Sequence, residues 1–213
     1  MDIEQIFVST VYDNIAEHFS DTRYCIWNFV RIFLETQDPL HKGIDIGCGN
    51  GKNLCIRDDL DIIGIDNCQT FVDICIKKKL RVFQQNCCRL RFKKKSFDYA
   101  LSIAVFHHLA SDIRRYMAMK QMIRILKPGG KGLVSVWALE QDNRNNNMKI
   151  RQFVPGDNYV PWIRKKDKQT FIRYYYIFNE RLFREFIHQF TENIYINALF
   201  NERGNWIVEF TKK

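Results

Sequence analysis

Two acidic residues and the glycine-rich turn between them are best placed in this sequence to do chemistry. Asp45 stands in the stretch Lys42–Gly51, and Asp66 ends the next apolar stretch. Gly47 and Gly49 allow backbone conformations that are barred to other residues, and they let a ligand come close. Asp45 would repel a phosphate, and the turn lacks the later glycine of a pyrophosphate-binding loop. The pattern therefore favours a cationic or hydroxyl-bearing ligand.

A strand, a glycine turn and a second strand that ends in an acid resemble the donor site of class I methyltransferases. The resemblance implies that S-adenosylmethionine is the methyl donor, bound by Asp45, Gly47, Gly49 and Asp66. Asp66 is expected to hold the ribose hydroxyls. Asn86 follows the third expected strand, where this fold often presents an acid to the adenine amine, and its amide oxygen can accept the same hydrogen bond. A surface turn residue is the alternative interpretation of Asn86.

The fourth expected strand ends at Ala104 and runs into His107 and His108. Ligands of open α/β sheets collect at the carboxyl ends of the strands. Ala104 is therefore assigned to the cofactor site. One of the two histidines is expected to face the methyl donor and the other to cap the following helix. The remaining histidines, at positions 18, 41 and 188, are interpreted as surface residues or satisfied core residues.

The composition limits the class of protein. A chain of 213 residues with 46% hydrophobic residues fits one domain. An acidic N-terminus and the lack of a long apolar run predict no membrane segment and no signal peptide, and so a cytoplasmic location, with the nucleus as a second one. Seven cysteines without Cys-x-x-Cys spacing predict reduced thiols and no metal site. The net charge of +9 implies an anionic partner.

Hydrophobic periodicity predicts a single-domain α/β protein with a mostly parallel, Rossmann-like sheet. Residues 1–38 are expected to form a helical cap with helices over 3–19 and 24–35. Residues 140–170 are expected to be an irregular insertion on the substrate side, followed by an extended segment over 171–178 and a helix that Asn179 caps. A C-terminal antiparallel hairpin is expected over 193–210. The remaining expected strands are 43–46, 61–65, 81–84, 99–104 and 132–138, and the remaining expected helices are 51–57, 68–79 and 113–126.

Longer motifs point to a narrower family. They are Tyr12–Ala16, Phe19–Tyr24, Asp45–Lys52, Ser102–His108, Trp137–Gln141, Val160–Trp162 and Arg173–Tyr176. Together they resemble the eukaryotic tRNA methyltransferase that esterifies 5-carboxymethyluridine at wobble position 34, a domain that also occurs fused to an AlkB-like dioxygenase. The resemblance implies a tRNA substrate, 5-methoxycarbonylmethyluridine as product, and a small zinc-binding activator subunit as partner. Asn86, where the family usually has Asp, and a short insertion after Trp162 depart from the family pattern.

The reaction that this resemblance implies needs positioning more than it needs a base. A carboxylate acceptor is already ionised at neutral pH, so it must only be held in line with the sulfonium. A tight bidentate arginine clamp would stabilise the ground state and slow the attack. The catalytic candidates are Arg23, His107 and Arg173, and the substrate-binding candidates are Tyr159, Trp162 and Tyr174, which could stack on a flipped base. Core packing is the alternative for the aromatic residues.

Three basic segments, 77–79, 89–95 and 164–168, could follow a tRNA backbone, although such a segment is usually a solvated face. Two other functions remain open. A methyltransferase for a small carboxylic acid would use the same pocket chemistry, and it would not lose substrate affinity steeply with added salt. A catalytically silent, RNA-binding partner subunit would keep the fold, but the intact acids Asp45 and Asp66 argue against it.

Overall fold

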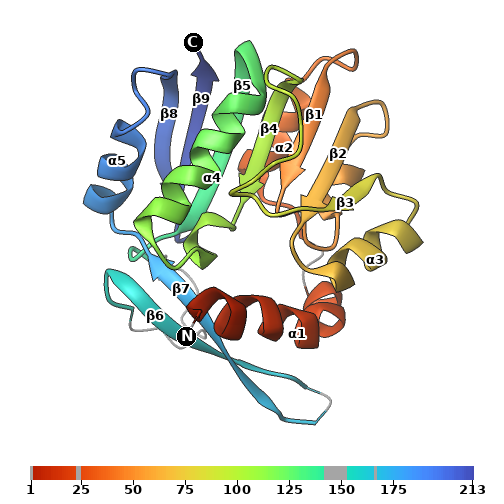
Figure 1. The fold of residues 1–213 in the computed structure, drawn as a ribbon, viewed down its shortest axis with the longest axis vertical. Helices are drawn as coiled ribbons and strands as arrows, with labels where there is room; N and C mark the ends of the chain where they lie inside the picture. Colours follow the sequence, from red (N-terminus) through yellow and green to blue (C-terminus); the bar gives the residue numbers. More distant parts are fainter. Residues whose placement is uncertain (1, 23–24, 142–152, 166) are drawn as a thin grey trace.

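A seven-stranded sheet forms the centre of the molecule (Figure 1). The computed structural model describes residues 2–22, 25–141, 153–165 and 167–213. The strand order is β3-β2-β1-β4-β5-β9-β8, in which β1 to β5 are parallel and β9 runs antiparallel to β5 and β8. The strands are β1 (Lys42–Ile46), β2 (Asp61–Asp66), β3 (Val82–Gln84), β4 (Phe97–Ile103), β5 (Leu126–Trp137), β8 (Ile194–Glu202) and β9 (Asn205–Lys212).

Helices cover both faces of this sheet. On one face, α4 (Asp112–Ile125) and α5 (Glu180–His188) contribute side chains such as Met119 and Phe183 to the larger core cluster. On the other, α2 (Asn28–Glu35) and α3 (Gln69–Lys77) pack Phe33 and Val72 into a second cluster. These clusters confirm the predicted single-domain, Rossmann-like fold with its C-terminal hairpin, here β8–β9.

Hydrogen bonds to side-chain caps explain where α4 and α5 begin. Ser111 Oγ accepts a hydrogen bond from Arg114 N at the start of α4, and Asn179 Oδ1 accepts one from Leu182 N at the start of α5. The Asn179 cap was predicted, whereas a histidine cap for α4 is wrong, because Ser111 takes that place. The predicted helix over 51–57 shortens to a 3₁₀ turn, η2 (Lys52–Cys55), since the glycine turn occupies the start of this connection.

The expected helical cap is only half correct. A π-turn, η1 (Gln5–Ser9), leads into α1 (Thr10–Asp21), which lies beyond the carboxyl ends of the parallel strands (Figure 1). The second expected cap helix, α2, instead packs on the sheet face, because its apolar residues share a buried cluster with residues of β4, β5 and β9.

The expected irregular insertion over 140–170 is wrong in its second half. β6 (Gly156–Ile163) pairs antiparallel with β7 (Thr170–Ile177) as a separate two-stranded ribbon beside α1 (Figure 1). Val160 in β6 packs with Tyr175 and Ile177 in a small cluster, which gives the strand a buried side. Pro161 is tolerated because β6 pairs on one side only. Residues 142–152 of this insertion lie outside the described part of the chain.

Candidate active site

The glycine turn after β1 is tied to the end of β2. Backbone N–H groups of Gly47 and Cys48 donate to Ile65 O at 2.7 and 2.9 Å, and Gly49 N donates to Asp66 Oδ2 at 2.8 Å. Gly47 and Gly49 have φ of +77° and +54°, which explains why glycine stands there. A Cβ at Gly47 would lie 2.4 Å from Val105 Cγ2, but one at Gly49 would meet nothing within 4 Å. Gly49 therefore borders open space, where a ligand can approach the backbone.

Asp45 lies fully buried, one residue before the carboxyl end of β1. Its Oδ2 accepts a hydrogen bond from Asn53 Nδ2 at 3.0 Å, while Asp45 Oδ1 and Asn53 Oδ1 have no partner in the described part of the chain. Burial raises the pKa of Asp45 to about 7, and the charge of Asp66 contributes to this shift. Two buried, unpartnered acceptor oxygens beside the glycine turn fit a cationic ligand with N–H donors.

Asp66 and Ala104 sit at two strand ends near this turn. Burial raises the pKa of Asp66. The hydrogen bonds that its carboxylate accepts from the N–H groups of Cys68 and Gly49 lower this pKa, but by less. Ala104 has φ of +59°, a strained conformation for a residue with a Cβ, and its N–H donates to Ser135 O and Oγ. Such strain persists only where the surroundings impose it, and it is common at ligand sites.

Asn86 lines a polar pocket of about 440 Å³ together with Asn67, Gln84, Gln85, Arg89 and Arg91. The pocket lies next to Asp66, where the ends of β2 and β3 meet. The Asn86 side chain is held in place, because its Oδ1 accepts a hydrogen bond from Cys88 N at 2.9 Å. The structure thus places Asn86 beside the acid expected to hold ribose.

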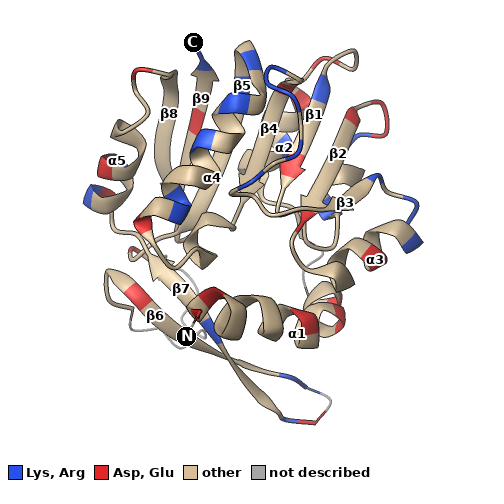
Figure 2. Cartoon of the chain, viewed as in Figure 1, with Lys and Arg blue, Asp and Glu red and all other residues tan. Residues whose placement is uncertain are grey.

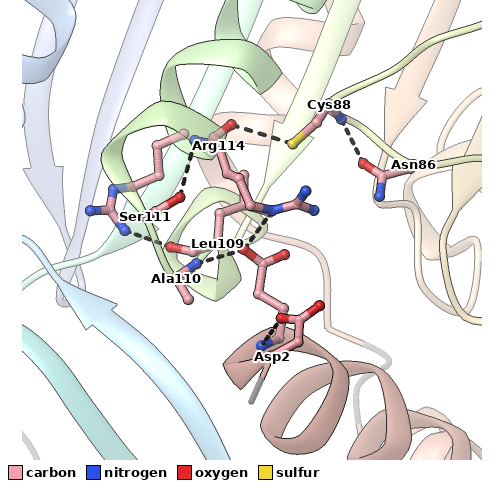
Figure 3. A network of polar contacts seen from close by, with 9 residues as sticks. Asp2, Asn86, Cys88, Leu109, Ala110, Ser111 and Arg114 are labelled. Carbon is pink, nitrogen blue, oxygen red and sulfur yellow. Dashed lines mark hydrogen bonds and ion pairs between the residues drawn. The ribbon is translucent and has the colours of Figure 1, made fainter.

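A chain of polar contacts fastens the N-terminal segment to this region (Figure 3). Glu4 Oε1 accepts hydrogen bonds from Ala110 N at 2.8 Å and from Arg114 Nε at 2.6 Å. Cys88 Sγ in turn donates to Arg114 O at 3.3 Å. The start of α4 therefore connects the segment before α1 with the loop that carries Asn86.

Arg173 on β7 is a buried cation that is only partly paired. Its guanidinium packs against the rings of Trp162 and Tyr175, whose centres lie 4.8 and 5.0 Å from Cζ. Nη1 donates to Tyr175 Oη at 2.6 Å, but Nε and Nη2 have no partner among the residues that the structure describes. These two nitrogens share one edge of the planar guanidinium, the edge that binds a carboxylate with two parallel hydrogen bonds.

Both histidines of the His107-His108 pair lie beside Tyr175, His107 buried and His108 half-buried. His107 stacks on the Tyr175 ring at 5.0 Å, and its Nδ1 accepts a hydrogen bond from Trp137 N at 3.1 Å. His108 Nδ1 lies 3.1 Å from Tyr174 O and His108 Nε2 lies 3.0 Å from Tyr12 Oη. Burial lowers the pKa of His107 well below its usual value and that of His108 to about 3, and the charge of Arg173 lowers both further. Both rings are therefore neutral at physiological pH.

The other substrate candidates fall in different places. Tyr159 is half exposed and packs edge-on against Phe7 and Tyr174. The structure does not bring Tyr174 together with Arg173: strand alternation turns its ring away from the face that carries Arg173, and its hydroxyl donates to Asp157 Oδ1 at 2.6 Å. Trp162, by contrast, packs its ring against the Arg173 guanidinium. Arg23 lies outside the described residues.

Sequence reasoning missed His18, Tyr12 and Tyr175 as site residues. Neither ring nitrogen of His18, both of which are buried, has a partner, so it is not a satisfied core residue, and its ring lies edge-on to Trp162 at 5.5 Å. Tyr12 and Tyr175 looked like ordinary apolar positions of a helix and a strand. Both belong to the motifs Tyr12–Ala16 and Arg173–Tyr176 that carry the family resemblance, and this membership was the signal in the sequence that could have identified them. Among the described residues, no group of three His, Cys, Asp or Glu side chains could hold a metal ion.

Comparisons with known proteins agree with this geometry. Residues 44–134 match the family model described as a methyltransferase domain. Among solved structures, the [4+2]-cyclase SpnF superposes with a TM-score of 0.67 at 14% identity, covering 99% of this chain and 96% of that one. A complex between the Haloferax volcanii Trm112 methyltransferase activator and a methyltransferase gives 0.65 at 13% identity, covering 97% and 98%. Fold and site define a class I methyltransferase, the class that uses S-adenosylmethionine as methyl donor.

The particular family follows from closer relatives. The tRNA (carboxymethyluridine(34)-5-O)-methyltransferase of Schizosaccharomyces pombe is 34% identical over 226 residues, covering 98% of this chain and 97% of the relative. The Xenopus tropicalis tRNA (carboxymethyluridine(34)-5-O)-methyltransferase alkbh8 is 42% identical over 147 residues, which is 69% of this chain but 23% of that protein. The chain belongs to the family of tRNA (carboxymethyluridine(34)-5-O)-methyltransferases.

Proposed function

We propose that this protein methylates the carboxylate of 5-carboxymethyluridine at wobble position 34 of tRNA to give 5-methoxycarbonylmethyluridine. The unpaired Nε–Nη2 edge of the buried Arg173 guanidinium carries the proposal. A buried cation with two free donors on one edge has a large desolvation cost, which a bound carboxylate offsets. The names of the relatives agree with this acceptor.

The donor side of the site fits S-adenosylmethionine. Asp45 Oδ1 and Asn53 Oδ1 supply the unpartnered acceptors, the open space at Gly49 admits the ligand, and Asp66 is the acid for ribose hydroxyls. Asn86 and Ala104 border the same strand ends. The donor supplies a methyl group on a positively charged sulfur. The buried carboxylate of Asp45 favours a positive ligand electrostatically.

On the acceptor side the residues orient and desolvate the carboxylate. No base is needed, because a carboxylic acid with a pKa near 4 is ionised at neutral pH, and neutral His107 and His108 are not required to take a proton. The Trp162 ring packs against the Arg173 guanidinium, and Nε and Nη2 are buried, so the acceptor reaches them only when a neighbouring group moves away. The carboxylate loses its charge as the ester forms, so Arg173 binds the ground state more tightly than the transition state. Its contribution is therefore to position the carboxylate, and this gain must exceed the cost of ground-state stabilisation.

The test is methyl transfer to tRNA from cells that lack this enzyme. We expect the purified protein, with S-adenosylmethionine, to form a methyl ester at position 34, detected by nucleoside mass spectrometry and removed by mild alkali. Arg173→Gln should keep donor affinity and lose most transfer, whereas Arg181→Gln, on the exposed side of α5, is the matched control. An unmodified position 34 with wild-type protein would contradict the proposal.

The choice between tRNA and a small carboxylic acid depends on the basic surface. Figure 2 shows the basic loop between β3 and β4 running from the site end of the sheet towards the opposite end. Arg89 and Arg91 line the Asn86 pocket, so this loop starts at the site. Arg164 at the β6–β7 end is paired with Asp167 and is the weaker candidate. If the substrate is a polyanion such as tRNA, its affinity should fall steeply with added salt, and this salt dependence should be weaker in Arg91→Ala.

We also propose a small zinc-binding activator subunit as partner, seated on the open edge of β3. This edge is beside the donor pocket, and Phe83 on β3 and Ile76 on α3 are each at least half exposed. A partner strand would satisfy the unpaired backbone groups and stabilise the donor site. Phe83→Asp should abolish co-purification and weaken donor binding, whereas Tyr195→Asp on the opposite edge strand, β8, should do neither.

For the cellular location we propose the cytoplasm, with the nucleus as a second location. The reason is that the enzyme must meet its proposed substrate, mature tRNA, in the compartment where that tRNA is found. None of the helices in the described part of the chain is long and apolar enough to cross a membrane. Imaging of the tagged protein in living cells tests this, and accumulation in any other compartment would contradict it.

A further inference from the structure

Three side chains link a backbone carbonyl to the Arg173 guanidinium. His108 Nδ1 lies 3.1 Å from Tyr174 O, His108 Nε2 lies 3.0 Å from Tyr12 Oη, and Tyr12 Oη lies 3.4 Å from Tyr175 Oη. Tyr175 Oη then accepts from Arg173 Nη1 at 2.6 Å. Tyr12 comes from α1, His108 from the turn η3 (Phe106–His108), and Tyr175 and Arg173 from β7, so three elements converge. We call this chain of bonds the relay.

Chemistry sets the direction of every bond in the relay. A carbonyl oxygen only accepts, so His108 carries its proton on Nδ1. A neutral His108 then has a bare Nε2, which accepts from the Tyr12 hydroxyl. The Tyr12 oxygen is left to accept from the Tyr175 hydroxyl, whose own oxygen accepts from Arg173. All donors therefore point away from the guanidinium.

We infer that Tyr175, Tyr12 and His108 are positioning residues that hold Arg173 with its Nε–Nη2 edge turned to the acceptor, and so make the site selective for a carboxylate over a carboxamide. The inference rests on the proposed function, because that carboxylate is the acceptor. The relay occupies Nη1, and the rings of Trp162 and Tyr175 pack against the guanidinium, with ring centres 4.8 and 5.0 Å from Cζ. One edge remains, and it offers donors only.

The selectivity follows from the donors on that edge. A carboxylate presents two acceptor oxygens and neutralises the buried charge. The matching carboxamide offers one oxygen, leaves the charge uncompensated, and turns an NH₂ group towards an N–H donor. A tRNA with 5-carbamoylmethyluridine at position 34 should therefore be bound poorly. The relay maintains this difference only while it keeps the guanidinium from rotating.

The experiment compares Tyr12→Phe and Tyr175→Phe with wild type and with Tyr176→Phe, a control on the same strand that is outside the relay. Measurements are kcat and KM on 5-carboxymethyluridine tRNA, donor affinity, and competition by 5-carbamoylmethyluridine tRNA. We expect kcat to fall about 100-fold, as for misplacement by ~1 Å, with donor affinity and tRNA KM nearly unchanged. Preference for the carboxylate tRNA should fall in the relay variants and persist in the control.

A second pair of variants tests the histidine. His108→Gln keeps an acceptor for Tyr12 and should retain more activity than His108→Leu at similar melting temperature. In the wild-type protein, ¹⁵N NMR should show His108 protonated on Nδ1 and bare on Nε2. The opposite tautomer, or relay variants equal to Tyr176→Phe in both kcat and preference, would overturn the inference. A wild-type protein inactive on the carboxylate tRNA would instead overturn the proposed function.

Discussion

Donor binding should depend on pH through Asp45. The carboxyl is fully buried in β1, and its pKa is raised from 3.8 to about 7, while Asp45 Oδ1 has no partner. A cationic donor favours the ionised form. Below pH 7 binding must therefore expel a proton. The ionised fraction falls from about one half at pH 7 to about one tenth at pH 6, so donor affinity should fall about fivefold over that unit.

The stability of the free protein should change in the opposite sense to donor affinity. The folded pKa of this acid lies above its unfolded value, so the native state holds the extra proton between pH 3.8 and about 7. The free energy of unfolding therefore decreases as pH rises through this window, by about 2–3 kcal/mol between pH 5 and pH 8, so the protein becomes less stable. Asp45→Asn removes the titrating group and should remove this loss relative to wild type.

Calorimetry at pH 6 in two buffers of different ionisation enthalpy measures the released proton directly. We expect about one proton per S-adenosylmethionine bound by wild type and about none by Asp45→Asn. Urea unfolding of both proteins from pH 5 to pH 8 measures the stability difference. Equal proton release in the two proteins, or a wild-type affinity that is flat from pH 6 to pH 7, would refute the role of Asp45 as a buried anion facing a cation.

Three further predictions concern the loop, a cap and the N-terminal contact. Gly49→Ala should cost only ~1–2 kcal/mol of stability, because of the φ of +54° at this position, yet it should weaken donor binding. Gly47→Ala should cost more stability, because its new Cβ would meet Val105. Urea unfolding measures stability and calorimetry measures donor affinity, and equal stability losses in the two variants would contradict this prediction. Asn179→Ala should cost ~1 kcal/mol in urea unfolding through loss of the α5 cap, and an unchanged midpoint would argue against it. Glu4→Gln should weaken the contact to Arg114 and speed amide exchange in α1 several-fold in hydrogen-exchange mass spectrometry, unless other contacts hold the segment.

The donor half of the site was predictable from local sequence. Asp45, the glycine turn and Asp66 lie within one strand–turn–strand unit, so their spacing along the chain already determines that they meet at one edge of a parallel sheet. The same holds for the Asn179 cap, which depends on residues three apart. Short-range hydrogen bonds and glycine conformations leave a direct trace in the order of residues.

The acceptor half was decided by tertiary structure. Arg173, Tyr12 and His108 come from a strand, a helix and a turn that are far apart in the chain, and their contacts exist only when the β6–β7 ribbon meets α1 at the end of the sheet. Strand alternation put Tyr175 rather than Tyr174 beside Arg173, because a register difference of one residue exchanges the two faces of the ribbon. The sequence contained these residues, but only packing determined which of their polar groups were paired and which edge of Arg173 was left for a ligand.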